Sequence, residues 1–159
     1  MDGIMAQVAN EMVRVFTGTA KMAGHSLKVY GYACLIAEGE GLNPHYRKTL
    51  EMAALLHDIG IPRSIEKYQS AAGPYQEQEG PPIAREILAN LGVKPERIAR
   101  VCRLIGIHHT YGLQEASDYQ ILLDADFIVN VEEGSLKREA VLGQLHSTTG
   151  KALFAALLG

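Results

Sequence analysis

The sequence has only two cysteines, Cys34 and Cys102, and they lie far apart in apolar segments of helical character. Two isolated cysteines exclude the disulfide framework of a small secreted protein, so we expect both to be buried free thiols in a reducing compartment. No apolar run approaches the length of a membrane span. Residues 1–16 include acidic side chains and no uninterrupted apolar core, which argues against a signal peptide. These absences predict a cytoplasmic protein.

The chain also lacks a large excess of charge of either sign. Its formal net charge is -3, so composition gives no reason to expect a nucleic-acid polymer or a membrane as partner. The contents of 47% hydrophobic and 21% charged residues are ordinary for a soluble globular protein. With 159 residues the chain is most simply one domain, residues 1–159, and is long enough to bury a proper core.

No segment of useful length alternates apolar and polar residues as a half-buried strand does, whereas most of the chain has helical periodicity. We therefore predict an all-α domain. A helix beginning at Pro44 is clearly marked, because Asn43 is a good N-cap and proline suits the first helical position, and Gly60 and Pro62 mark its end. The other expected helices cover residues 2–17, 23–39, 81–90, 95–108, 118–132, 135–147 and 150–158.

One stretch, residues 60–79, lacks such periodicity and is polar, with glycine and proline in it. It is too long for a plain connector, and long loops in compact domains are often functional. We expect a non-helical lid that closes over a binding site, with Gly73-Pro74 forming a turn in it.

Histidine and aspartate side chains recur at the ends of apolar helical segments. His57 and Asp58 directly follow the run "AALL", and His108 and His109 follow "RLIGI". An isolated pair at a helix end is most often a surface pair that the helix dipole stabilises, but such a pair needs no apolar run before it. His25 opens an apolar helix whose pattern could turn its imidazole inward.

The segment "YQILLDADFIVN" places carboxylates inside a strongly apolar helix. Asp124 and Asp126 are two residues apart and point to nearly opposite sides, so at most one belongs to a shared site. Asp126 and Asn130 are four apart and share a face, and their burial would require a polar partner. His45 and His146 lie in polar surroundings, so we expect both at the surface.

One shared cation would explain why several apolar helices each carry an inward-facing histidine or aspartate. Imidazole and carboxylate ligands with few or no thiolates suit Zn, Mn, Fe, Co or Ni, with Mg a further option, and leave coordination positions for water or substrate. The alternative is a helical bundle whose polar side chains only satisfy one another.

The order of these residues resembles the HD-domain superfamily of metal-dependent phosphohydrolases. "LLHDIG" is close to the signature of that superfamily, "HSLKVYGYA" resembles its first histidine helix, and "ADFIVN" fits its Ala-Asp-x-x-x-Asn pattern. "EGPPIAREIL" is similar to the helix that follows the lid in many bacterial members. The resemblance implies a single HD-type helical bundle with a metal site in its core. It implies that His25, His57, Asp58 and Asp126 bind the primary metal.

Two departures from the superfamily pattern concern a second metal and the substrate. Members with two metals also use a histidine pair, here His108 and His109, and a further histidine at the position of Gln76. Glu79 or Glu77 could substitute for that missing ligand, so we expect one metal site and leave a second open. Ile61 stands where many members have a lysine after the "HDIG" motif, which removes one expected phosphate contact.

The resemblance implies a hydrolase of phosphate esters or anhydrides, in which a metal-activated water attacks a nucleotide or other small phosphate compound. Asp58 would hold both metal and water, and His109 or His108 would act as general acid. A homodimer is compatible with the apolar helix faces. Two alternatives stay open: a di-iron oxygenase on the same scaffold, and a catalytically silent domain that binds metal or ligand. The candidate substrate-binding residues are Lys21, Lys28, Arg63, Lys67 and Asn130.

Overall fold

The computed structural model describes residues 3–159, and all regular structure within them is helical, which confirms the all-α class. Residue 2, where the first expected helix begins, lies outside the described residues. No helix in the described part of the chain is both long and apolar enough to cross a lipid bilayer. The elements are α1 (Ile4–Val15), α2 (Ala20–Gly39), α3 (Pro44–Leu56), α4 (Ile61–Tyr68), α5 (Gly73–Asn90), α6 (Pro95–Ile107), α7 (Ser117–Glu132), α8 (Arg138–Val141) and α9 (Thr148–Leu158).

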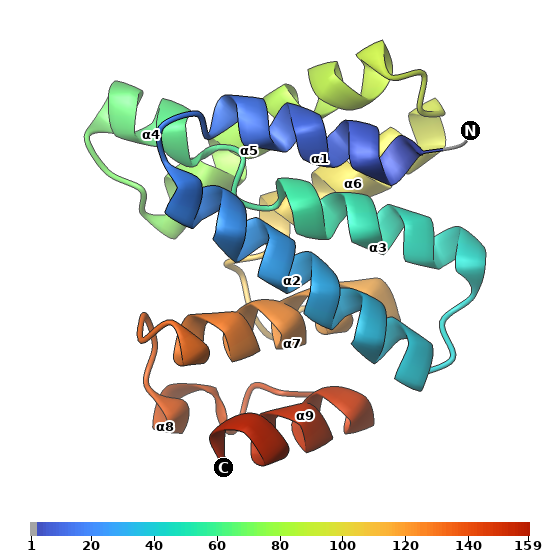
Figure 1. Cartoon of the computed structure of the whole chain (residues 1–159), viewed down its shortest axis with the longest axis vertical. Helices are drawn as coiled ribbons and strands as arrows, with labels where there is room; N and C mark the ends of the chain where they lie inside the picture. Colours follow the sequence, from blue (N-terminus) through green and yellow to red (C-terminus); the bar gives the residue numbers. More distant parts are fainter. Residues whose placement is uncertain (1–2) are drawn as a thin grey trace.

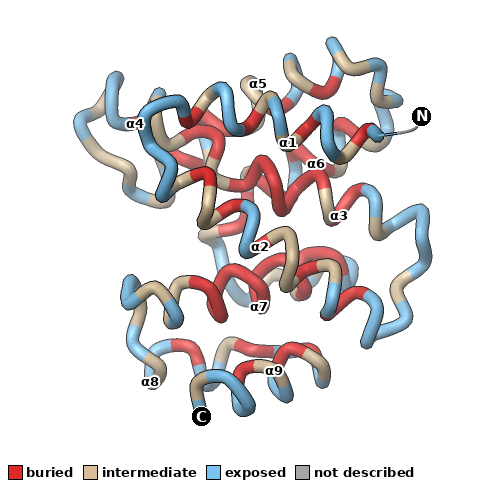
Figure 2. The backbone as a smooth tube through the Cα atoms, in the orientation of Figure 1, coloured by how far each residue is buried: buried red, intermediate tan, exposed pale blue. Residues whose placement is uncertain are grey.

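The core forms where α2, α3, α6 and α7 pack together. In Figure 1, α2 runs between α3 and α7 and crosses in front of part of α7, and α9 packs on the side of α7 away from α3. Figure 2 shows that buried positions concentrate in α3 and α7, and α7 is buried at every residue from 121 to 129. A helix that is apolar all round must be surrounded on all sides. The carboxylates of α7 therefore lie inside the molecule, where they need partners.

Two helix starts follow from local sequence. The Asn43 side chain accepts a hydrogen bond from the backbone N–H of His45 at 2.8 Å, and Pro44 occupies the first turn of α3, as predicted. The Ser147 side chain caps α9 and is itself held by Asp124, whose carboxylate accepts from the Ser147 hydroxyl at 2.6 Å and from the Ser147 N–H at 2.8 Å. Asp124 thus ties α9 to the core.

The structure corrects the prediction of a non-helical lid at residues 60–79. That stretch contains α4 and the first two turns of α5, and the link between them is short. Gly73 and Pro74 begin α5 and do not form a turn in a loop. Proline is usually tolerated only in the first turn of a helix, because it lacks an N–H and crowds the preceding turn. Pro81 and Pro82 nevertheless lie inside α5, so the predicted start of a helix at residue 81 is wrong by two turns.

Three smaller corrections concern helix ends and burial. The predicted helix at residues 135–147 is helical only in α8, because turns flank it on both sides. The third helix ends at Leu56, and the residues up to Gly60 form turns before α4. Both cysteines are free, as expected, but only Cys102 is buried, and Cys34 is half-buried. His45 and His146 are exposed, as predicted.

Candidate metal centre

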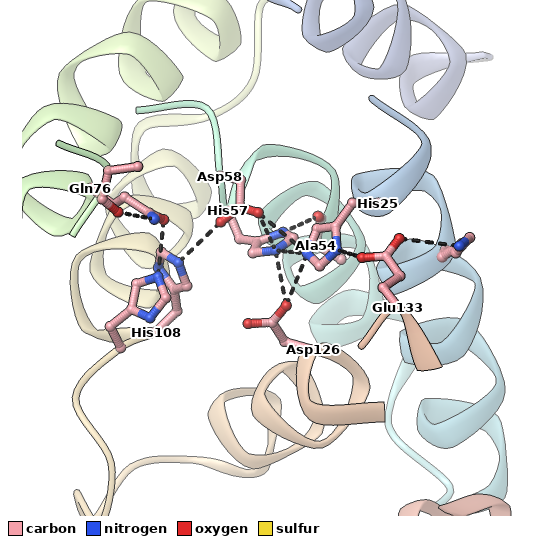
Figure 3. A network of polar contacts seen from close by, with 11 residues as sticks. His25, Ala54, His57, Asp58, Gln76, His108, Asp126 and Glu133 are labelled. Atoms are coloured by element: carbon pink, nitrogen blue, oxygen red, sulfur yellow. Dashed lines mark hydrogen bonds and ion pairs between the residues drawn. The ribbon is translucent and has the colours of Figure 1, made fainter. Parts of the chain in front are cut away.

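Four polar side chains from three helices converge in the core (Figure 3). His25 comes from α2, His57 and Asp58 follow the end of α3, and Asp126 comes from α7. One carboxylate oxygen of Asp126 lies 3.1 Å from Nε2 of His25 and 3.3 Å from Nε2 of His57. Oδ2 of Asp58 lies 3.3 Å from each of the same two nitrogens. The structure therefore brings together the four residues that the sequence suggested as ligands.

The outer nitrogens of both imidazoles are occupied by groups that can only accept a hydrogen bond. Nδ1 of His57 lies 2.7 Å from the carbonyl oxygen of Ala54, and Nδ1 of His25 lies 2.7 Å from the carboxylate of Glu133. Each Nδ1 must therefore carry a hydrogen, which leaves a lone pair on Nε2 of each neutral ring. These two Nε2 atoms are 3.3 Å apart and face the two carboxylates. While both rings are neutral, four acceptors thus meet with no donor between them.

The electrostatics of the cluster reflect this shortage of positive charge. Burial lowers the pKa of His57, but the charges of Asp58 and Asp126 outweigh burial and raise that pKa well above its usual value. Burial raises the pKa of Asp58, whereas the neighbouring His57 lowers it to well below the usual range. The cluster therefore attracts a cation, which can be extra protons on the imidazoles or a metal ion.

The donor set fits a divalent metal. Two imidazole nitrogens and two carboxylate oxygens are ligands of the kind that Zn, Mn, Fe, Co and Ni take in proteins. Ligand atoms of His25, His57 and Asp58 lie within 4.8 Å of one another, which allows them to share one ion. Hydrogen bonds from Nδ1 to Ala54 and Glu133 orient both rings, as partners of metal-binding histidines commonly do.

A second group of candidate ligands shares Asp58 with the first. Asp58, His108 and His109 also offer ligand atoms within 4.8 Å of one another. Nδ1 of His108 lies 2.6 Å from the carbonyl oxygen of Ile105, so its lone pair is on Nε2, 3.5 Å from Oδ1 of Asp58. That Nε2 is buried and has no hydrogen-bond partner among the described residues. A buried, unpartnered acceptor beside a carboxylate is a further position that a cation would satisfy.

Gln76 takes the place expected for a further histidine in this second group (Figure 3). Its amide nitrogen donates to the carbonyl oxygen of Ala71 at 2.7 Å, which fixes which end of the amide is the oxygen. That oxygen lies 2.9 Å from Nε2 of His109, so Nε2 of His109 carries a hydrogen and donates it. Burial, followed by the neighbouring His108, lowers the pKa of His109 to about 4, so its ring is neutral at pH 7.

Comparison with known families agrees with this geometry. The model of the HD domain family matches residues 22–142, which is most of the 159-residue chain. The chain belongs to the HD-domain family. HD domains bind divalent metals, and the family consists largely of metal-dependent hydrolases. No curated protein and no solved structure matched the chain.

Four side chains predicted near the reaction in this HD domain do not line the cavity beside the cluster. The structure corrects the prediction for Glu79, whose carboxylate accepts from the Tyr68 hydroxyl at 2.9 Å and pairs with Lys67 at 3.5 Å. Arg63 lies with Lys67 on α4, and neither lines the cavity at the metal centre. Lys28 pairs with Glu133 at 3.1 Å and with Glu132 at 3.2 Å, so it contacts the cluster only through the carboxylate of Glu133.

The metal centre of this HD domain opens into a cavity of about 510 Å³. His109, Gln76 and Asn130 line it, as the sequence suggested, and Ile61 forms part of its wall. Sequence reasoning missed Glu133, which lines the same cavity. The available signal was spacing, because Glu133 lies seven residues, or two helical turns, after Asp126 and so falls on the same side. The residues leading into α2 were also missed, and those that line the cavity are Gly18, Thr19 and Ala20, whereas the sequence had suggested the next lining residue, Lys21.

A close helix contact explains the glycine of the "HDIG" motif. A Cβ atom added to Gly60 would lie 2.6 Å from the backbone nitrogen of Gly80 and 3.0 Å from the carbonyl oxygen of Gln76. No side chain fits between these backbones, so α5 approaches the end of α3 directly. This contact places Gln76 within reach of His109 and close to Asp58.

Proposed function

We propose that this HD domain is a metal-dependent hydrolase of phosphate ester or anhydride bonds in a nucleotide or other small phosphate compound. The observation that carries the proposal is the meeting of four acceptor atoms, from His25, His57, Asp58 and Asp126, beside an open cavity. A purely structural cluster would be expected to contain donors for those acceptors, and it would have no reason to border a cavity of substrate size.

Each residue of the cluster has a role in this proposal. His25, His57, Asp58 and Asp126 would hold the ion, and Glu133 and the Ala54 carbonyl orient the two rings. A divalent metal bound there would supply an activated water and offset charge on phosphate oxygens. Asp58 faces both ligand groups, so its second oxygen is available to accept a hydrogen bond from that water.

His109 is the better placed of the two histidines suggested for proton transfer, because it lines the cavity and His108 is buried behind it. Burial lowers the pKa of His109 to about 4, so the ring enters the reaction neutral and is a weak base. We therefore propose that His109 relays a proton through hydrogen bonds of its neutral ring, in place of the general-acid role suggested by the sequence.

The start of α2 supplies positive potential on the substrate side of the cavity. The first N–H groups of a helix have no partner within it, and this end of the helix dipole favours anions. The Thr19 hydroxyl donates to the carbonyl oxygen of Phe16, so it does not cap these groups. Lys21 also lines the cavity. We propose that a substrate phosphate lies between the metal and the start of α2, with the Asn130 amide in reach.

Metal analysis combined with activity measurement tests the proposal. The purified protein is expected to contain close to one or more equivalents of a divalent metal and to hydrolyse a member of a panel of nucleotides and generic phosphodiesters. His57→Ala should remove both metal and activity, whereas His146→Ala, at an exposed position, should remove neither. Metal-loaded protein that cleaves nothing on the panel would contradict the hydrolase assignment.

The second ligand group is compatible with an alternative function, that of a di-iron oxygenase. Asp58, His108 and His109 could hold a second ion, which both a two-metal hydrolase and a di-iron oxygenase require. Iron content, a visible absorption band and oxygen consumption with an organic substrate would identify the oxygenase. Tight ligand binding without turnover by the metal-loaded protein would identify a catalytically silent domain.

A further inference from the structure

A second cavity lies at the opposite end of α3 and α6 from the metal centre. It has a volume of about 590 Å³ and forms where α1, α3 and α6 begin, on the side of the molecule where the N-terminus lies in Figure 1. Small-molecule sites typically have volumes of roughly 300–1,000 Å³. Its walls share no residue with those of the cavity at the metal centre.

Arg97 is held in this cavity by neutral acceptors alone. Its Nε donates to the hydroxyl of Thr49 at 3.2 Å, and its Nη2 donates to Nδ1 of His45 at 3.0 Å and to the His45 carbonyl oxygen at 3.2 Å. No carboxylate within residues 3–159 forms an ion pair with it. The guanidinium is therefore fixed in direction while its charge is left without a counter-ion.

Arg100 in the same wall shows the contrast. Its guanidinium pairs with Asp118 at 2.7 Å and with Glu115 at 2.8 Å, so two carboxylates of this chain offset its charge. Arg100 therefore has carboxylate partners within the chain that offset its charge. Arg97 is only one helical turn away and has no carboxylate partner.

Two lysines add to the unbalanced charge. Lys48 and Lys94 line the cavity, and the side chain of neither forms an ion pair or hydrogen bond with another described residue. Glu96 is the one carboxylate in the described lining. Three cationic side chains without a carboxylate partner, Lys48, Lys94 and Arg97, therefore line the cavity with one anionic one, and the fourth cation, Arg100, is already paired with Asp118 and Glu115. The first turns of α3 and α6 both line the cavity, and the start of α6 has no side-chain cap, so its positive helix end adds to this charge.

Part of the wall is apolar. Met52 and Ile4 are buried side chains that border the cavity, and Val93 lies in the loop before α6. Nη1 of the oriented Arg97 guanidinium has no hydrogen-bond partner among the described residues, so it can donate to a phosphate oxygen, and the apolar wall suits a ring or a short carbon skeleton. We infer that this cavity binds a small phosphate monoester with an apolar or aromatic portion, at a site separate from the metal centre and independent of the reaction there.

Titration of the Zn²⁺-loaded full chain with AMP, followed by amide NMR spectra of the labelled protein, tests the inference. Adenosine is the uncharged comparison and inorganic phosphate the headgroup alone. The variants are Arg97→Gln, which also removes hydrogen bonds to Thr49 and His45, and the double variant Lys48→Gln/Lys94→Gln, whose two lysine side chains form no ion pair or hydrogen bond with another described residue. Lys151→Gln, an exposed lysine on α9, makes one of the same charge changes away from the cavity.

The inference expects AMP to shift the amides of Gly92, Val93 and Thr49 and to bind at least about tenfold more tightly than adenosine, since charge-assisted hydrogen bonds are lost without the phosphate. Arg97→Gln and the double lysine variant should each weaken AMP binding about tenfold or more, and Lys151→Gln should not. The double variant carries the test if Arg97→Gln does not fold. Shifts confined to the metal centre, equal binding of adenosine, or unchanged affinity in both variants would overturn the inference.

Discussion

Glu133 offers the most direct test of how the metal centre is built. Its carboxylate accepts from Nδ1 of His25 at 2.7 Å and also pairs with Lys28 at 3.1 Å. The carboxylate side chain is only 13% exposed, so water cannot readily replace it as the partner of His25. We predict that Glu133→Ala frees the His25 ring to rotate and reduces its basicity, and thereby weakens metal binding without removing a ligand.

The expected size follows from the geometry. Loss of a partner that orients a metal-binding histidine typically weakens metal affinity by about 10–100-fold. That range corresponds to about 1.4–2.8 kcal/mol. Glu133→Gln keeps an acceptor oxygen but loses the charge, so its effect should be smaller, at most about tenfold. Affinity would be measured by competition between the protein and a chelator for Zn²⁺ at fixed pH.

The neighbouring residue supplies a matched control. Glu132 also pairs with Lys28, at 3.2 Å, but it does not contact His25. Glu132→Ala makes the same change of charge one residue away and should leave Zn²⁺ affinity nearly unchanged. If Glu132→Ala and Glu133→Ala weaken binding equally, the effect is one of general charge, and the orienting role assigned to Glu133 is refuted.

Four further predictions concern stability. Gly60→Ala should destabilise the fold by about 1–3 kcal/mol in urea unfolding, because its Cβ would lie 2.6 Å from the Gly80 backbone. An unfolding midpoint equal to that of the wild type would show that α5 can move away freely. Asp124→Ala should lower the free energy of unfolding by about 2–4 kcal/mol, because it removes the hydrogen bonds from Ser147 and from the His146 N–H. The metal content should stay unchanged, and loss of metal would contradict the separation of Asp124 from the metal centre. Chelation should lower the melting temperature, because a metal at 100 times its Kd adds about 2.7 kcal/mol to the folded state. The metal-free protein should also lose stability as pH rises above about 6.5. The pKa of His57 is raised in the folded state, so folding is favoured while this ring is protonated and less so once it loses the proton. A melting temperature that does not change with pH would contradict this.

The features that local sequence could predict are those that depend on near neighbours. Asn43 and Pro44 mark the start of α3 through a capping bond and a fixed backbone angle, and the structure has both. The segment "YQILLDADFIVN" is strongly apolar around the helix, which predicts that α7 is buried, and the buried run from 121 to 129 agrees. The separation of Asp124 from Asp126 also followed from helix geometry alone, and the two carboxylates do serve different partners.

The features that local sequence could not predict depend on contacts between distant elements. Proline predicts a helix boundary from its own chemistry, but α5 continues through Pro81 and Pro82 because it is packed along α6 on one side and α4 on the other. Glu79 was read as a possible ligand from its position near Gln76, yet it is three residues further along α5 and therefore meets Tyr68 instead. Glu133 had no motif of its own, and only the packing of α7 against α2 reveals its partner.

The hydrogen bond between Gln76 and His109 bears on whether a second metal ion can bind. Asp58 directs one oxygen at His25 and His57 and the other at His108, so it can belong to both ligand groups at once. The Gln76 amide accepts a hydrogen bond from Nε2 of His109 and donates one to the Ala71 carbonyl oxygen, so the orientation of the amide is fixed. While that bond persists, His109 can offer a cation only its other ring nitrogen. A glutamine at this position therefore does more than remove one ligand, because it also restricts the histidine next to it, and the first group is left as the better-prepared site for a metal.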